Sequence, residues 1–304
     1  MAPPIDVAAY QLSDKHPPDK GDTYSFPPEE NLWLQCHQAI LGEVESMQKA
    51  LEALVERRKT TAKNEPLEAW VVDCLHTVWS GHRQYLEAHH EHEEVLVGEI
   101  AKKRFQWPKE ISSTHDDLDN MFKAIHDLMV NLRSAMETQN GLEADQVLER
   151  LLEKWTGYQK ELTLHIELEE ATIVPLVRAY MSHNEMNMLI FKMMSNVPKN
   201  ELGAIVHYTG EEHIRTVTMP YQRMPSFLWN WLLKPAVDAY RLTYVASAEA
   251  VRLGIPKHSE PMPVGLISRF FKGIMGYFSV PFSVLQKVLA TLAASNPTKV
   301  LKSD

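Results

Sequence analysis

The sequence predicts an all-α protein, an up-down-up-down four-helix bundle with a C-terminal helical extension. Apolar side chains recur at steps of three and four residues up to about residue 182, as at Ile40, Val44 and Met47. This is the spacing of one helix face. Strand signals are almost absent from this part, and the connections between the periodic segments are short. Short connections favour antiparallel neighbours in a bundle.

Each expected helix has its own start or stop signal. Pro27 and Pro28, followed by Glu29 and Glu30, are typical of a helix start, because acidic side chains suit the positive end of the helix dipole. The second helix begins near Pro66 and should end on the basic residues around Arg104. The expected helices cover residues 28–59, 66–104, 108–136 and 142–181.

The chain divides into three parts by composition. Residues 1–27 alternate prolines and charges without apolar periodicity and are expected to form a flexible N-terminal arm. Residues 28–182 form the expected bundle. Residues 183–304 contain shorter helical pieces interrupted by prolines, Pro235 among them, and are expected to pack on the bundle as an extension. Within them, the aromatic and aliphatic stretch 264–295 favours a docked C-terminal element over a helix pair on a membrane surface.

Composition excludes several function classes. The 304 residues carry a formal charge of −9, which argues against a nucleic-acid partner. No Gly-rich phosphate loop or nucleophile motif is present, and no catalytic residue is assigned. The two cysteines, Cys36 and Cys74, are too few for a disulfide framework. The opening residues show no secretory signal, and a cytoplasmic location is expected.

Histidines with apolar flanks occur on all four expected helices. Two of them are followed four residues later by glutamate, a spacing that places both side chains on one helix face. A further pair, His90 with Glu94, lies about a quarter-turn away, and only one of the two registers is expected to face inward. Leu86, Val97 and Ile100 share a helix face with His89 and Glu93, and they favour this pair as the one that faces inward. The expected inward set is His37, His89, Glu93, His115, His165 and Glu169.

This pattern predicts a metal site. A single His–Glu pair is more often a solvated surface pair, but an ordered set on four successive helices is a much rarer coincidence. A bound cation would compensate the burial of so many titratable groups. Imidazole and carboxylate ligands without thiolate favour iron or manganese, with zinc as a further option. Two carboxylates also suit bridging between two ions, as in di-iron bundles.

These residues resemble the hemerythrin-like (HHE cation-binding) family. The matching signals are His37 on the first helix, "HHEHEEVL" on the second, "HDDLDNMF" on the third and "HIELEEATIVPL" on the fourth. The resemblance covers roughly residues 30–181, and the segment "MPSFLWNWLLKPAVDAYR" is similar to the region after the bundle in longer fungal members. It implies a non-haem di-iron centre that binds dioxygen, with Glu93 and Glu169 as bridges and Glu170 as an alternative to Glu169.

One position departs from the family. Oxygen-carrying hemerythrins have a second histidine four residues before the ligand of the third helix, where this chain has Ile111. The departure implies a more open metal position, which metal catalysis requires. His90, His92 and Asp119 are the candidates for a replacement ligand.

Three functions therefore compete. The favoured one is an oxygen-activating oxidoreductase, an oxygenase or oxidase, acting on a small organic substrate. The alternative is a carrier, sensor or store for oxygen or iron, and the third is a metal-free interaction module. An enzyme predicts an apolar pocket that reaches the metal. A carrier predicts only a narrow cavity for a gas.

Overall fold

The computed structural model of the chain describes residues 5–12, 32–61, 64–93, 98, 103–182, 185–186, 189, 197–222 and 224–256. The regular secondary structure of these residues is helical, and they contain no strand apart from one isolated bridge between Gln11 and Phe105. The predicted all-α class is therefore confirmed. Among the described helices, none combines the length and the apolar character needed to cross a bilayer.

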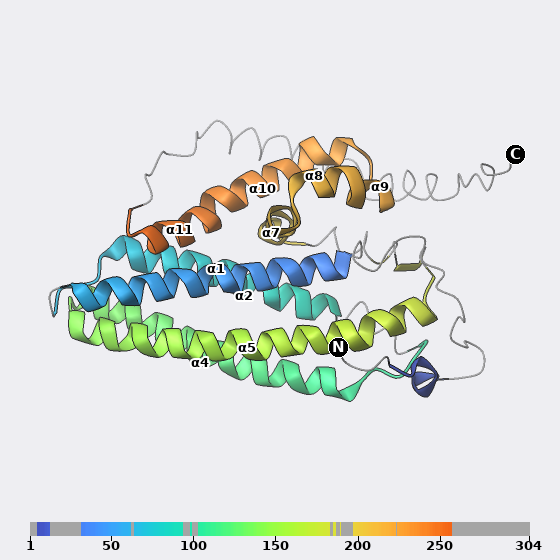
Figure 1. Cartoon of the computed structure of the whole chain (residues 1–304), viewed down its shortest axis with the longest axis horizontal. Coiled ribbons are helices and arrows are strands. Elements are labelled where there is room, and N and C mark those ends of the chain that lie inside the picture. The colour runs from blue at the N-terminus through green and yellow to red at the C-terminus, as the bar shows by residue number, and fades with distance from the viewer. Residues whose placement is uncertain are drawn as a thin grey trace, which may run out of the picture. The chain divides into compact units, whose positions relative to one another are not determined.

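Four long helices lie side by side along the molecule (Figure 1). Each packs against two of the others: α1 against α2 and α5, and α4 against α2 and α5. Between them the helices enclose one large apolar core. The bounds are Leu32–Thr60 for α1, Ala69–Glu91 for α2, Lys109–Glu137 for α4 and Gly141–Tyr180 for α5.

The turn between α4 and α5 is explained by its local sequence. Gln139 adopts a left-handed backbone conformation with a φ of 53°, and the next residue, Asn140, caps α5. The Asn140 side chain accepts a hydrogen bond from the backbone N–H of Glu143, at 3.2 Å. It thereby satisfies one of the amide groups that the first turn of a helix leaves without a partner.

The second helix differs from its prediction at the C-terminal end. Helix α2 ends at Glu91, and a π-helical turn comes next, at His92 and Glu93. Lys103 and Arg104, expected in the last helical turn, instead lie in a turn before Phe105. A π turn uses wider hydrogen-bonded rings than an α-helix, so it shifts the helical register where it occurs.

The extension forms a second set of helices against one side of α1 and α2 (Figure 1). Helices α7 and α11 pack on α1, and α11 and η6 pack on α2. Its elements are α7 (Lys199–Thr209), α8 (Glu211–His213), η4 (Ile214–Thr218), α9 (Met219–Tyr221), η5 (Trp229–Leu233), α10 (Lys234–Tyr240), η6 (Arg241–Val245) and α11 (Ala246–Leu253).

Pro235 does not interrupt the extension, contrary to the sequence-based expectation. Helical structure continues from Trp229 to Leu253, with Pro235 in the first turn of α10 directly after the π-helical segment η5. Proline lacks the backbone N–H that an α-helix uses and crowds the carbonyl four residues earlier. A widened π turn before the proline is compatible with both constraints.

Glycines allow the extension to approach the long helices closely. A Cβ atom at Gly42 would lie 2.3 Å from the Tyr208 ring, and one at Gly81 would lie 2.2 Å from the Tyr244 ring. Both tyrosines belong to the extension. The absence of a side chain at two positions on α1 and α2 therefore makes room for aromatic rings of the covering layer.

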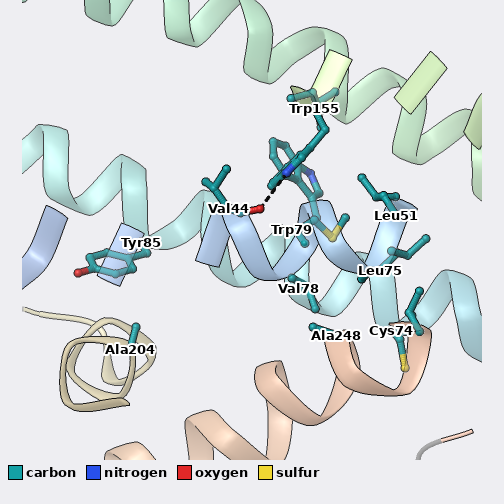
Figure 2. Packing of buried hydrophobic residues seen from close by; sticks show 14 of the residues in the cluster. Val44, Leu51, Cys74, Leu75, Val78, Trp79, Tyr85, Trp155, Ala204 and Ala248 are labelled. Carbon is teal, nitrogen blue, oxygen red and sulfur yellow. Dashed lines mark hydrogen bonds between the residues drawn. The ribbon is translucent and has the colours of Figure 1, made fainter. Parts of the chain in front are cut away.

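The core is largely aromatic and aliphatic (Figure 2). Trp155 of α5 is fully buried, and its indole N–H donates a hydrogen bond to the backbone carbonyl of Val44 on α1, at 3.1 Å. Ala204 of α7 and Ala248 of α11 belong to the same cluster. The extension thus shares one continuous core with the long helices.

Part of the expected N-terminal arm is ordered against α5. Residues 7–10 form the short 3-10 helix η1 (Val7–Tyr10), and the Tyr180 hydroxyl donates a hydrogen bond to the Val7 carbonyl at 2.8 Å. Residues 1–4 and 13–27 of that arm and the stretch 264–295, with its predicted docking or membrane role, lie outside the described residues.

Candidate metal centre

The six side chains of the predicted inward set converge from all four long helices. His37 comes from α1, His89 from α2, and His115 from α4; Glu93 lies in the π turn after α2. The remaining two come from α5. Two groups of side chains each place their donor atoms within 4.8 Å of one another: His37, His89, Glu93 and Glu169 form one, and His90, Glu93, His115 and His165 form the other.

The two carboxylates lie between the imidazoles. Glu93 Oε1 is 2.8 Å from His89 Nε2, whereas Glu93 Oε2 is 3.7 Å from His115 Nε2. Glu169 Oε2 is 3.3 Å from His37 Nε2, whereas Glu169 Oε1 is 3.6 Å from His165 Nε2. Each carboxylate thus presents one oxygen to each group.

Several of these donor atoms are buried and face one another without the geometry of a hydrogen bond. The buried atoms without a hydrogen bond include both carboxylate oxygens of Glu93 and of Glu169, together with the Nε2 atoms of His37, His89 and His165. Buried polar atoms are nearly always hydrogen-bonded, because leaving one unsatisfied is unfavourable by about 1–3 kcal/mol. A concentration of such atoms facing one another fits a site that binds a cation.

Hydrogen bonds on the far side of two rings turn their lone pairs inward. The Thr114 hydroxyl donates to the Ile111 carbonyl at 2.7 Å, so its oxygen accepts from His165 Nδ1, at 2.8 Å. His37 Nδ1 donates to Glu170 Oε1 at 3.0 Å. When either ring is neutral, Nε2 is therefore its unprotonated nitrogen, which is the form that binds a metal ion.

The electrostatics favour ionised carboxylates, neutral imidazoles at His90 and His165, and a protonated imidazole at His37. Burial lowers the pKa of His90 well below its usual value and also lowers that of His165. Burial acts to raise the pKa of Glu93, but His89 and His37 hold it well below the ordinary range. Burial likewise acts to lower the pKa of His37, but the carboxylates around the ring, with Glu169 foremost, hold this pKa well above its usual value. A cation at the site would take the place of the proton on His37.

His90 corrects the expectation that only one register of the second helix faces inward. Its ring stacks on His115 at a centroid distance of 4.2 Å and belongs to the second group of donors. Neighbouring helix positions are about 100° apart, so both can border an interior space of this width. His89 and His90 therefore reach the site together, one in each group.

The remaining candidates lie away from the two groups. Glu170 is half-buried and bonds the outer nitrogen of His37 rather than facing Glu93. Ile111 is fully buried in the apolar cluster that contains Trp33 and Ile173. Of the three candidates to replace its missing imidazole, only His90 is in a donor group; His92 is buried outside both, and Asp119 is exposed.

A second buried polar layer was not predicted from the sequence. His82 and Tyr158 lie seven residues, or two helical turns, before His89 and His165. His82 Nε2 accepts a hydrogen bond from the Tyr158 hydroxyl at 2.7 Å, and His82 Nδ1 lies 3.0 Å from Glu43 Oε2. The only sequence signal for His82 and Tyr158 is their spacing of seven residues from His89 and His165. Glu43, the partner of His82, lies in no recognisable motif.

The extension helps to form an apolar cavity beside the donor groups. His89 and Glu93 form part of its wall, Trp33 comes from α1, and Ile205 and Glu201 come from α7. Its volume of about 70 Å³ leaves room for several water molecules. A space of this size is larger than a dioxygen molecule needs.

No protein-family model, curated protein or solved structure matches the chain. The hemerythrin-like resemblance therefore stays a prediction that rests on the residues themselves. The described structure establishes a coarser class: an all-helical protein whose buried histidine and glutamate clusters can hold a metal ion.

Proposed function

We propose that the protein is a hemerythrin-like four-helix bundle with a dinuclear iron centre that binds dioxygen. One observation carries the proposal: Glu93 and Glu169 each direct one oxygen toward each of the two imidazole groups. This is the arrangement that two bridging carboxylates need. An iron pair bound there would supply the oxygen binding and redox chemistry, while the chain supplies ligands, charge balance and a dry surrounding.

The residues assigned to the two metal positions are those of the two donor groups. His37 and His89 belong to one position, and His115, His165 and His90 to the other, with the two glutamates shared. His90 takes the role of the imidazole that Ile111 cannot supply. Ligands of this kind, without a thiolate, favour iron over zinc or manganese in an oxygen-binding role, given the family resemblance.

The apolar cavity favours the enzymatic form of this proposal, an oxygenase or oxidase acting on a small organic substrate. A substrate pocket is typically apolar with a few polar groups, and this one borders His89 and Glu93 directly. The alternative is a carrier, sensor or store for oxygen or iron. The resemblance to hemerythrins supports that alternative.

The test is optical spectroscopy on iron-loaded protein, reduced without oxygen and then exposed to it. The proposal predicts an absorption change that requires Glu93 and Glu169 and is absent from Glu93→Gln and Glu169→Gln. His76→Gln is the matched control, because His76 lies on α2 outside both groups and bonds the Met129 carbonyl. A transient change that decays irreversibly supports the oxidoreductase, whereas a stable, reversible one supports the carrier. A folded, iron-loaded protein that shows no response to oxygen would refute the binding of dioxygen in both forms and leave only the role in iron storage or sensing.

A further inference from the structure

Besides Glu93 of the donor groups, the wall of the cavity contains a second carboxyl group, that of Glu201, which lies among apolar neighbours. Glu201 lies in the first turn of α7 and is 3% exposed. Its Oε2 atom has no hydrogen-bond partner. Around it the wall consists mostly of aliphatic and aromatic side chains, namely Leu32, Trp33, Val197, Leu202, Ile205 and Leu233. A buried, unsatisfied carboxyl in such a wall is the feature that requires an explanation.

The groups that face Glu201 do not offer it a positive charge. Glu43 and the Cys36 thiol approach from α1, and the Tyr85 phenol approaches from α2. His89 and Glu93 lie in the same cavity wall. Burial, with Glu43 adding to it, raises the pKa of Glu201 to about 8. The group is therefore a neutral carboxylic acid at neutral pH, with an O–H to donate.

We propose that this cavity binds a small neutral molecule, mostly apolar, that has one hydrogen-bond-accepting oxygen, and that Glu201 donates its proton to that oxygen in a hydrogen bond. The rest of the molecule contacts the aliphatic and aromatic wall. This inference names a substrate class for the proposed function and depends on it for the chemistry, but the binding step itself needs no metal.

The polar group lies in the same cavity as the metal-binding wall. Glu201 borders this space from α7, and His89 with Glu93 borders it from the end of α2. A molecule held by its oxygen at Glu201 would therefore lie beside the donor groups. An unsatisfied acid in a mostly apolar pocket also gives selectivity, because it discriminates strongly against analogues that lack the acceptor.

The experiment measures binding of three matched probes to the full chain by saturation-transfer NMR titration. The probes are cyclopentanone, cyclopentane and the cyclopentylammonium ion. We expect cyclopentanone to bind at least about tenfold more tightly than cyclopentane at pH 7, the gain of one buried hydrogen bond. Equal binding of these two, or tightest binding of the ammonium ion, would overturn the proposal.

Variants assign the effect to Glu201. Glu201→Leu should remove the preference for the ketone, whereas Glu201→Gln should keep a weaker one, since the amide still donates. Glu212→Gln is the control, because Glu212 is an exposed acid on α8. If Glu201→Leu does not fold, Glu201→Gln still decides the matter at pH 9. At pH 9 the Glu201→Gln protein should keep its preference for cyclopentanone, while the wild-type protein should lose most of this preference. A wild-type protein that keeps the preference at pH 9, or a variant that loses it, would overturn the proposal.

The titrations are run on metal-free and on iron-loaded protein. Ketone preference in a chain that never takes up iron would refute the proposed function and leave this inference standing. Iron uptake without a preference for the ketone would refute this inference and leave the proposed function standing.

Discussion

His37 Nδ1 donates a 3.0 Å hydrogen bond to Glu170 Oε1, while the opposite nitrogen of the same ring faces Glu169. A carboxylate behind a ligating histidine fixes the ring orientation and strengthens the ring as a donor. Glu169 and Glu170 are sequence neighbours on α5, so this helix supplies one carboxylate to each side of His37. Their different roles result from a rotation of about 100° between adjacent positions.

Glu170→Ala should weaken iron binding about 10- to 100-fold, the usual effect of removing such a supporting carboxylate. The six donors of the inward set remain, so the protein should still bind metal at saturating iron. A competition titration against a chelator measures the change. Glu167→Ala is the control, because Glu167 is exposed on the same helix. Equal affinity of the two variants would contradict the role assigned to Glu170.

Glu201 should make the protein less stable as the pH rises. Its pKa is raised from 4.5 to about 8, so the folded state holds a proton that the unfolded state has released between these values. The free energy of unfolding therefore falls over this range, by an amount on the order of 4 kcal/mol at most. Glu201→Gln should remove this fall and be the more stable protein at pH 8. Denaturant unfolding of both proteins in the same metal state, at pH 5 and pH 8, measures it.

The difference between the two Glu201 proteins should be small at pH 5, where both side chains are neutral. A wild-type protein as stable as the variant at pH 8 would show that Glu201 is ionised without penalty.

The buried pair of His82 and Tyr158 should contribute stability independently of the metal centre. Tyr158→Phe removes the hydroxyl that donates to His82 Nε2 and leaves that buried nitrogen unsatisfied. The loss should be about 1–3 kcal/mol in the free energy of unfolding. Iron content at saturation should be unchanged, because this layer lies two turns away from the donor groups. A Tyr158→Phe protein that folds with wild-type stability but loses iron would contradict the separation of this pair from the metal centre.

Two glycines should respond in opposite directions to alanine. At Gly203 an added Cβ would lie 2.6 Å from the Ala236 carbonyl oxygen, a backbone atom, so Gly203→Ala should separate α7 from α10 and destabilise the extension. At Gly157 nothing lies within 4 Å, and Gly157→Ala should stabilise α5 by about 0.5–1 kcal/mol. Thermal unfolding of the two variants measures both effects. A neutral Gly203→Ala would contradict the close packing of α7 on α10.

Much of the helical content could be predicted from periodicity and local signals. The turn at Gln139 and Asn140 and the long helices α1, α4 and α5 are explained by apolar spacing, prolines and a capping side chain, all of which are local. The end of α2 could not be predicted in this way. The π turn at His92 and Glu93 leaves no distinct local pattern, and the sequence continues with helix-forming residues.

The predicted donors come together because spacing on a helix determines which side chains share a face. The expectation that only one register of the second helix faces inward is wrong, because the interior space is wide enough for two adjacent positions; His90, a candidate replacement ligand, lies in a donor group. Glu43 and Glu201 were missed for another reason. A carboxyl becomes significant here only through burial by elements distant in sequence, such as α7 covering α1, and a linear pattern does not contain that information.

The central claim is a dinuclear site, and the most direct measurement is an anaerobic titration of the metal-free protein with ferrous iron. We predict saturation at about two irons per chain, as expected for a di-iron carboxylate bundle. Glu93→Gln should lower the affinity of both positions, because Glu93 faces both groups. A correctly folded protein that saturates at one iron, or binds none, would contradict the claim.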